Sequence, residues 1–318
     1  MKKELARLKE ALHSFLEKHL SLETRQRVKK IFFRDAKSKC DAVAQWAIQD
    51  EVCNLKCEYC RFSHSIKEVP PADVKPLLEA LDKTGKIFHV SICGNGETFL
   101  VPNIIEVLQE LTRRHYVSLV TNLTPKKIRE FCEKIDPKKV LDITASLHIK
   151  ELERTGLMDT FIENYLLCEK KGFNIRAQEV AHPSLLGEVE KYKRFFAEKG
   201  IRLYFDDCFA TYGGKSYPDA YTDEERRVFG LPRRQETLDK IYQKGKLCNA
   251  AYNVCTIAID GKVYPCPDLK EVIGDIHRGG IGFKKGLTVC PMDRCFCPIN
   301  FLYYELYLKA LEETRKRG

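Results

Sequence analysis

The sequence has no uninterrupted apolar run close to the eighteen or so residues that a membrane-spanning helix needs. Its first residues are charged and amphipathic, without the apolar core of a secretory signal peptide. It also lacks a solenoid-type repeat and a low-complexity tract. These absences argue against a membrane, secreted or repeat protein. We therefore expect a cytoplasmic protein, and its 318 residues suffice for one large domain or two small ones.

A basic strip with interleaved aromatic residues is also missing. The 54 Lys and Arg residues outnumber the 45 Asp and Glu residues, but the net charge of +9 is spread along the chain. Nucleic acid is therefore not an expected partner, although a metal-stapled nucleic-acid-binding protein remains one alternative. A hydrophobic fraction of 44% is enough for a sizeable core.

Cysteine, by contrast, is abundant, with 14 residues. The cytosol keeps thiols reduced, so metal or iron–sulfur ligation is expected rather than a disulfide scaffold. Nine cysteines fall into two groups, Cys53, Cys57 and Cys60 in the first, and Cys248, Cys255, Cys266, Cys290, Cys295 and Cys297 in the second. The other five are scattered and are mostly expected to be buried as small apolar side chains: Cys40, Cys93, Cys132, Cys168 and Cys208.

Short apolar runs alternate with helical patterns along the first two thirds of the chain. The expected strands are Val43–Ile48, Ile87–Ile92, Val117–Thr121, Val140–Ser146, Asn174–Val180 and Ile201–Phe205. The expected helices between them are Ala72–Asp82, Ile104–Arg113, Pro125–Ile135, Met158–Lys171 and Leu185–Lys199. Six such units predict an α/β fold with a parallel sheet, a partial (β/α)6 TIM-like barrel two units short of closure.

The predicted organisation has five parts. They are an N-terminal helical segment (1–41), the partial barrel (42–206), a Gly-, Pro- and charge-rich connection (207–245), a small cysteine-rich module (246–300) and a terminal helix (301–318). Thr124 and Pro125 are expected to cap and start a helix, and Gly172 and Gly200 to end two others.

Three closely spaced thiols follow the first expected strand, in the order Cys53-Asn-Leu-Lys-Cys57-Glu-Tyr-Cys60. A structural zinc site takes four ligands, so zinc here would need a distant fourth ligand such as His64. Three cysteines would instead leave one iron of a four-iron cluster without a protein ligand. Such an open coordination position is what a reactive metal site requires.

This segment resembles the hallmark of the radical S-adenosylmethionine (SAM) enzymes, CxxxCxφC with an aromatic residue at φ, where Tyr59 stands and is expected to take part in cofactor binding. The resemblance covers roughly residues 43–206, half of the chain. It implies that the three cysteines ligate a [4Fe-4S] cluster whose fourth iron binds the amino and carboxylate groups of S-adenosylmethionine. Reductive cleavage would then give methionine and a 5′-deoxyadenosyl radical, which takes hydrogen from a substrate carbon.

The loop after the second expected strand supports the resemblance. Gly94-Asn95-Gly96-Glu97-Thr98 is similar to the family's GGEP motif, with Asn95 and Thr98 as departures from it. By resemblance, Gly94, Gly96 and Glu97 meet the methionine ammonium group, since glycine lets a backbone approach closely. An ordinary glycine turn after a strand is the alternative.

Polar residues also stand at the ends of later expected strands, where functional residues of parallel barrels collect. Ser146 matches the position that contacts the ribose or carboxylate of S-adenosylmethionine in the family, and Asn122 is expected to line the same site. Glu179 and His182 follow the fifth expected strand, and Asp206 and Asp207 the sixth. For each of these four residues, the sequence leaves open whether the side chain contacts the substrate, caps a helix or forms a salt bridge.

The C-terminal cysteines resemble the SPASM/twitch extension of many radical enzymes. In that extension a cysteine precedes a β-hairpin whose glycine is followed by Gly-x4-Cys, as in Cys248, Gly261 and Cys266. Asp260 next to Gly261 favours a tight hairpin turn on its own chemistry. The resemblance implies an auxiliary [4Fe-4S] cluster bound by Cys248, Cys266 and two of Cys290, Cys295 and Cys297, with Cys255 left over; a zinc ribbon is the alternative.

The resemblance implies a radical SAM enzyme that receives electrons from a reductant such as flavodoxin or ferredoxin. We expect a small polar substrate such as a sugar or an aminocyclitol, because roughly forty residues before the first expected strand are too few for a leader-peptide-binding domain. A peptide or protein substrate is the alternative, and a non-catalytic electron carrier is a rival of another class.

The outcome of the reaction could be epimerisation, dehydrogenation or rearrangement. Epimerisation requires a hydrogen donor on the opposite face of the substrate, and a cysteine S–H group is suitable. Cys208 is the expected catalytic thiol because the end of the sixth strand faces the barrel mouth, ahead of Cys93 and Cys255.

Overall fold

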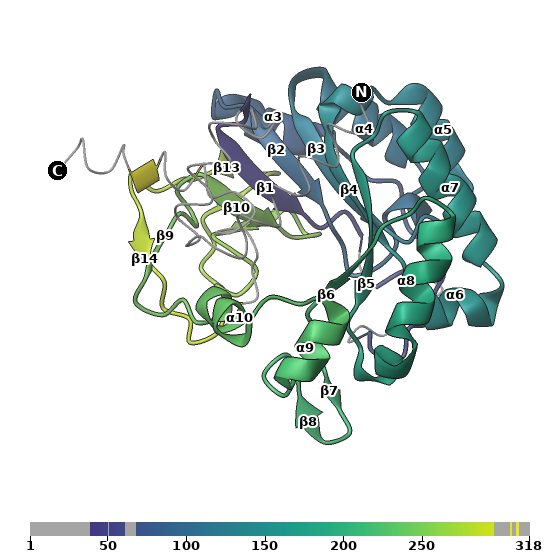
Figure 1. Ribbon diagram of the computed structural model, residues 1–318. Coiled ribbons are helices and arrows are strands. Elements are labelled where there is room, and N and C mark those ends of the chain that lie inside the picture. Colours follow the sequence, from purple (N-terminus) through teal and green to yellow (C-terminus); the bar gives the residue numbers. More distant parts are fainter. Residues whose placement is uncertain (1–38, 50, 61–67, 296–305, 307–309, 312–318) are drawn as a thin grey trace, which may run out of the picture.

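The computed structural model describes residues 39–49, 51–60, 68–295, 306, 310 and 311 (Figure 1). The helix expected near the start of the chain and Cys297 lie outside the described residues; of the expected terminal helix only residues 306, 310 and 311 are described, and they are helical. Among the described residues, no helix has the length and apolar character needed to cross a membrane.

Six parallel strands pair in chain order and confirm the partial (β/α)6 barrel (Figure 1). They are β1 (Ala42–Trp46), β2 (Phe88–Ile92), β3 (Tyr116–Thr121), β4 (Val140–Ser146), β5 (Ile175–Val180) and β6 (Leu203–Asp206). In the described part of the chain, β6 lies at one edge of the sheet and β13 at the other, so the sheet does not close.

The two faces of this sheet differ in chemistry. Every second strand residue, such as Ala44, Val90 and Leu119, is buried in one large core with the apolar sides of the helices. Burial of each large apolar side chain in this core contributes about 1.5–3 kcal/mol. The intervening residues are often polar, and Gln45 lies in register with Ser91 and Ser91 with Ser118. One face of the sheet is therefore covered by helices, and the other can offer hydrogen bonds.

The five expected helices lie between the strands, and several short helices are additional. In chain order, these elements are α3 (Lys75–Lys83), η2 (Thr98–Leu100), α4 (Ile104–Arg114), α5 (Lys127–Lys134), η3 (Pro137–Lys139), α6 (Ile149–Thr155), α7 (Met158–Lys170), η4 (Pro183–Glu188) and α8 (Val189–Glu198). The additional ones are the short helix α6 and the 3-10 helices η2, η3 and η4. Gly172 and Gly200 follow α7 and α8 with φ of 91° and 78°, which confirms them as helix ends. The predicted cap at Thr124 is wrong: α5 begins later, and the Thr124 hydroxyl bonds Asn122 instead.

The C-terminal strands extend the barrel sheet beyond β1. Strand β10 (Val254–Ile257) pairs with β1 in parallel, and β11 (Lys262–Tyr264), β12 (Gly274–Asp275) and β13 (Gly280–Ile281) follow antiparallel to one another. The hairpin predicted at Asp260-Gly261 is confirmed between β10 and β11. Gly261 has φ of 81°, and a Cβ there would lie 2.3 Å from the His277 ring. Strands β9 (Leu247–Cys248) and β14 (Thr288–Val289) form a separate pair.

The connection after β6 is more structured than its composition suggests. It contains a hairpin of β7 (Thr211–Tyr212) and β8 (Lys215–Ser216), followed by α9 (Asp223–Phe229) and α10 (Arg234–Ile241). Thr222 and Glu225 form a capping box at the start of α9. The buried Arg226 side chain lies 3.5 Å from Asp207 and donates to the Pro218 carbonyl. Asp207 therefore anchors this connection to the end of β6.

Candidate functional site

The first cysteine group lies in the loop that leaves the carboxyl end of β1. The buried Gln49 amide shapes the start of this loop, because its Nε2 donates to the Val52 carbonyl at 3.1 Å and its Oε1 accepts from the Val52 N–H at 3.0 Å. Cys53 follows directly. The Cys60 N–H donates to the Cys57 carbonyl at 3.0 Å, so the second half of the loop forms a turn.

The Gly94–Thr98 loop packs directly against this cysteine loop. The Glu97 N–H donates to the Val52 carbonyl at 2.8 Å. A Cβ at Gly96 would lie 2.1 Å from the same carbonyl oxygen and 2.3 Å from Gln49 Nε2, whereas one at Gly94 would come no closer than 3.3 Å to any atom. Glycine is therefore required at Gly96, because the Gly94–Thr98 loop lies in direct contact with the cysteine loop at this position.

The Glu97 carboxylate is buried and joins the ends of β2 and β3. Its Oε1 accepts from the Thr121 hydroxyl at 2.7 Å and the Phe99 N–H at 3.0 Å, and its Oε2 accepts from the Asn122 N–H at 2.6 Å. Burial raises the pKa of Glu97, and the three hydrogen bonds act in the opposite direction. Its contact with S-adenosylmethionine stays a prediction.

Asn122 approaches a thiol of the cysteine loop. Its Nδ2 lies 3.9 Å from Cys53 Sγ and donates to Asn54 Oδ1 at 3.0 Å. Its Oδ1 accepts from the hydroxyl of Thr124 at 2.7 Å, and Asn54 in turn donates to that hydroxyl. The end of β3 thus holds the cysteine loop through side-chain amides.

Tyr59 extends from the cysteine loop to the ends of β4 and β5. Its hydroxyl donates to Glu179 Oε1 at 3.0 Å and lies 2.7 Å from His148 Nδ1. Its ring stacks on His182, with centroids 5.4 Å apart and an interplanar angle of 30°. Burial raises the pKa of Glu179 to about 7. Ser146, the predicted cofactor residue at the end of β4, is half-buried and pairs in register with Gln178.

Sequence reasoning did not identify Gln49, Thr121 or His148 as part of this arrangement. His148 had a usable signal, since it follows an expected strand within two residues of Ser146. Thr121 had the same signal, since it ends the third expected strand, whereas Gln49 had none because its importance depends on which loops come into contact.

The electrostatics of the thiols suit a cationic iron–sulfur centre. Burial raises the pKa of Cys53 to about 11. Burial is also the main reason that the pKa of Cys57 is raised, even further than that of Cys53, and a charge on Cys53 is the second reason. The negative carboxylates of Glu151 and Glu179 also raise the pKa of Cys57. Thiolates in this loop therefore need a positive partner, which a metal centre supplies.

A second set of thiols lies in the C-terminal part. Cys248, Cys266, Cys290 and Cys295 line one cavity of about 160 Å³, and the rest of its wall is mainly apolar. Burial raises the pKa of Cys266, while hydrogen bonds from the backbone of Asp268 and Leu269 act against this. Four thiols around a mainly apolar wall, two of which (Cys248 and Cys266) accept backbone N–H···S bonds, fit an iron–sulfur cluster with four cysteine ligands.

Among the residues that the structure describes, no three His, Cys, Asp or Glu side chains gather closely enough to hold one metal ion together. A four-iron cluster does not need such a convergence, because each iron takes a single thiolate.

The three thiols considered as hydrogen donors have different surroundings. Cys255 is completely buried in the main core, in register with Ala44. Cys93 is half-buried next to the Gly94 loop. Cys208 is buried, and its backbone N–H donates to the Tyr221 hydroxyl at 3.2 Å. A negative charge on its thiol would raise the pKa of Tyr59. Burial raises the pKa of Cys208 to about 11.

No protein-family model and no curated protein matches the sequence. Solved structures of radical SAM enzymes share its fold. The structure of anSMEcpe with bound AdoMet has a TM-score of 0.54 and 18% identity, and covers 87% of this chain and 97% of that chain. The complex of anSMEcpe with AdoMet and the Cp18Cys peptide has a TM-score of 0.52 and 17% identity, and the match covers 87% of this chain and 98% of that chain. SuiB from Streptococcus suis, bound to its precursor peptide SuiA, has a TM-score of 0.52 and 17% identity, and the match covers 81% of this chain and 68% of that chain. The chain therefore has the fold of the radical SAM enzymes.

Proposed function

We propose that this chain is a radical SAM enzyme with an auxiliary iron–sulfur cluster. The observation that carries the proposal is the placement of three thiols, Cys53, Cys57 and Cys60, in a loop at the carboxyl end of β1. This loop is hydrogen-bonded to the Gly96–Glu97 turn after β2, in a fold shared with proteins solved with bound AdoMet.

In this proposal the three thiolates hold a [4Fe-4S] cluster, and its fourth iron is left to S-adenosylmethionine. When bound, the cluster would supply the electron that cleaves S-adenosylmethionine and so generates the radical that abstracts hydrogen from a substrate carbon. The chain's own part is to bind and orient. Gly94, Gly96 and Glu97 form the turn assigned to the methionine end, Ser146 is assigned to the ribose or carboxylate, and Asn122 to the lining of the same site. The same loops would keep water and other hydrogen donors away from the reacting atoms.

The auxiliary [4Fe-4S] cluster is assigned to Cys248, Cys266, Cys290 and Cys295. Their position around one cavity supports this set, and Cys297, which lies outside the described residues, stays an alternative ligand. Four protein thiolates would leave no iron open, which favours a role in electron transfer or in structure over substrate binding. A one-electron reductant such as flavodoxin or ferredoxin is the expected partner, and 13 free cysteines in the described residues suit the reducing cytoplasm.

A small polar substrate, such as a sugar or an aminocyclitol, is our first candidate. It is supported by the polar side chains on the sheet face opposite the helices, where Thr144, Gln178 and Asp206 lie on neighbouring strands. A peptide is the second candidate, because two of the similar structures contain one, the Cp18Cys peptide in anSMEcpe and SuiA in SuiB.

Anaerobic purification tests the cofactor assignment. The protein should be brown and hold about eight irons per chain if both clusters form, whereas a zinc protein is colourless. Incubation with reductant, S-adenosylmethionine and either polar metabolites or peptides then tests the substrate class. The class that raises 5′-deoxyadenosine output is the substrate class, and a colourless, zinc-containing protein would reject the proposal.

A further inference from the structure

We infer that Glu179 and His148 are positioning residues, which fix Tyr59 and through it the cysteine loop between Cys57 and Cys60. This inference rests on the proposed function. It gives both side chains a task inside the protein rather than contact with the substrate.

The Glu179 carboxylate is buried, with 1% of its surface exposed, and both of its oxygens are engaged. Oε1 accepts from the Tyr59 hydroxyl at 3.0 Å and from the Val180 N–H at 2.8 Å, and Oε2 accepts from the Ile149 N–H at 2.6 Å. A carboxylate is stable in such a place only when it is hydrogen-bonded. One side chain thus joins the segments that follow β1, β4 and β5.

His148 supplies the second contact to the same hydroxyl. Its Nδ1 lies 2.7 Å from the Tyr59 oxygen, and because the phenol hydrogen goes to Glu179, this nitrogen is the donor. His148 has φ of 48°, in the left-handed region that residues other than glycine rarely adopt. The unusual backbone is part of what directs the imidazole toward Tyr59.

The sequence position of Tyr59 makes this contact important. Tyr59 lies two residues after Cys57 and directly before Cys60, so a fixed phenol limits the movement of both thiols. A second attachment lies on the other side of Cys57, where the Lys56 N–H donates to Glu151 Oε1 at 2.6 Å. Glu151 belongs to α6, the helix that begins directly after His148. Preorganised ligands of this kind are what a reactive metal site requires.

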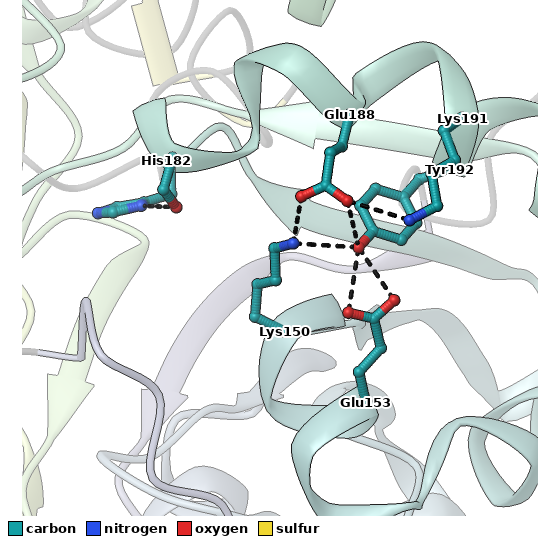
Figure 2. A network of polar contacts seen from close by, with 7 residues as sticks. Lys150, Glu153, His182, Glu188, Lys191 and Tyr192 are labelled. Atoms are coloured by element: carbon teal, nitrogen blue, oxygen red, sulfur yellow. Dashed lines mark hydrogen bonds and ion pairs between the residues drawn. The ribbon is translucent and has the colours of Figure 1, made fainter.

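A polar network outside the site joins α6, η4 and α8, of which α6 follows His148 and η4 follows His182 (Figure 2). Lys150 on α6 forms an ion pair with Glu188 at the end of η4 and lies 3.3 Å from the Tyr192 hydroxyl on α8. That hydroxyl also donates to Glu153 on α6 at 2.9 Å. Exposed ion pairs contribute little individually, but Tyr192 is buried and links α6 to α8. Because His148 precedes α6 and His182 precedes η4, the network supports both imidazoles around Tyr59.

The test compares Tyr59→Phe with Tyr165→Phe in anaerobically reconstituted protein. Tyr165 is a matched control, since its buried hydroxyl donates to the Ile175 carbonyl at 3.3 Å on the helix-covered side of the sheet. Three quantities are measured: iron content, the dissociation constant of S-adenosylmethionine, and the electron paramagnetic resonance spectrum of the reduced cluster with and without S-adenosylmethionine. We expect Tyr59→Phe to keep its iron, to bind S-adenosylmethionine roughly ten-fold more weakly, as for one lost hydrogen bond to a charged group, and to show an altered spectrum. Tyr165→Phe should match wild type in all three.

A pair of His148 variants decides the question if Tyr59→Phe does not retain iron. Asparagine tolerates the left-handed backbone and offers an amide near the position of Nδ1, so His148→Asn should restore the wild-type affinity that His148→Leu loses. Wild-type affinity and spectrum in Tyr59→Phe would overturn the inference, as would equal behaviour of the two His148 variants. A wild-type spectrum that does not respond to S-adenosylmethionine would instead reject the proposed function.

Discussion

Single residues at the site connect loops, and several of the same residues are the ones we propose to bind the cofactors. The cysteines and the Gly96–Glu97 pair could be identified from the sequence because their spacing is local. The contacts that hold them could not, since Glu97 meets Thr121 and Tyr59 meets Glu179 across separations of 24 and 120 residues. Hydrogen bonds between the ends of different strands leave no periodic signal in the chain.

Glu97→Gln should weaken both the fold and cofactor binding. A glutamine turns an NH2 group toward at least one of the donors that now meet the carboxylate, so the free energy of unfolding should fall by about 1–3 kcal/mol. S-adenosylmethionine should bind more weakly as the turn shifts. Denaturant titration and equilibrium binding measure the two effects. Glu163→Gln, in an exposed ion pair with Arg129, is the control, and equal stability of the two variants would refute this role for Glu97.

Cys208→Ala tests whether a thiol returns hydrogen to the substrate radical. With a pKa of about 11, Cys208 keeps its S–H hydrogen at neutral pH and can donate it. In deuterated water, the wild-type enzyme should place solvent deuterium at one product carbon, and Cys208→Ala should lose this while still forming 5′-deoxyadenosine. Cys255→Ala is the control: Cys255 lies in the main core, so this variant should behave as wild type. Normal turnover of Cys208→Ala and a product without deuterium would exclude epimerisation through this thiol and favour oxidation or rearrangement.

At the level of elements, the six barrel strands and the long helices could be predicted because each has its own apolar periodicity. The short helix α6 has seven residues and starts at a left-handed histidine, without a conventional cap. Helix α9 did carry a signal, the Thr222 and Glu225 capping box, inside a stretch whose composition indicated a linker. The pairing of β10 with β1 joins residues more than 200 positions apart, which no local pattern reveals.

Gly96→Ala tests the contact between the two loops. The added methyl group would collide with the Val52 carbonyl, so the Gly94–Thr98 loop must move. This movement breaks the hydrogen bond that the Glu97 N–H donates to the Val52 carbonyl. We expect a loss of about 1–3 kcal/mol in the free energy of unfolding, together with loss of iron from the first cluster. Gly187→Ala, where a Cβ meets nothing within 4 Å, is the control. Iron analysis and denaturant titration report the result, and a fully loaded, stable Gly96→Ala protein would contradict this account of the turn.

Single substitutions in the C-terminal module test its ligand set. Cys290→Ala and Cys295→Ala should each lose about four of about eight irons and keep the first cluster. Cys297→Ala and Cys255→Ala should retain all of their iron. Quantitative iron analysis distinguishes these results. If Cys295→Ala keeps its iron and Cys297→Ala loses it, Cys297 replaces Cys295 as the ligand.

At the scale of the whole molecule, both thiol sets lie near the paired strands β1 and β10. The Cys53–Cys60 loop follows the carboxyl end of β1, and the cavity of the second set includes Val254 at the start of β10. Because β1 and β10 are parallel and paired, the two sets lie toward opposite ends of the same strand pair. Leu306 packs with Val43 and Val254 of this pair. The architecture thus places both candidate clusters along β1, the strand that begins the barrel.

The formation of 5′-deoxyadenosine from S-adenosylmethionine tests the central claim most directly. It should be measured anaerobically with a reductant, in wild type and in the triple variant Cys53→Ala, Cys57→Ala and Cys60→Ala. We expect the wild-type protein to cleave S-adenosylmethionine, and the triple variant to keep the auxiliary iron, about half of the total, without any cleavage. Cleavage retained in the triple variant, or absent from fully iron-loaded wild type, would contradict the assignment of this chain as a radical SAM enzyme.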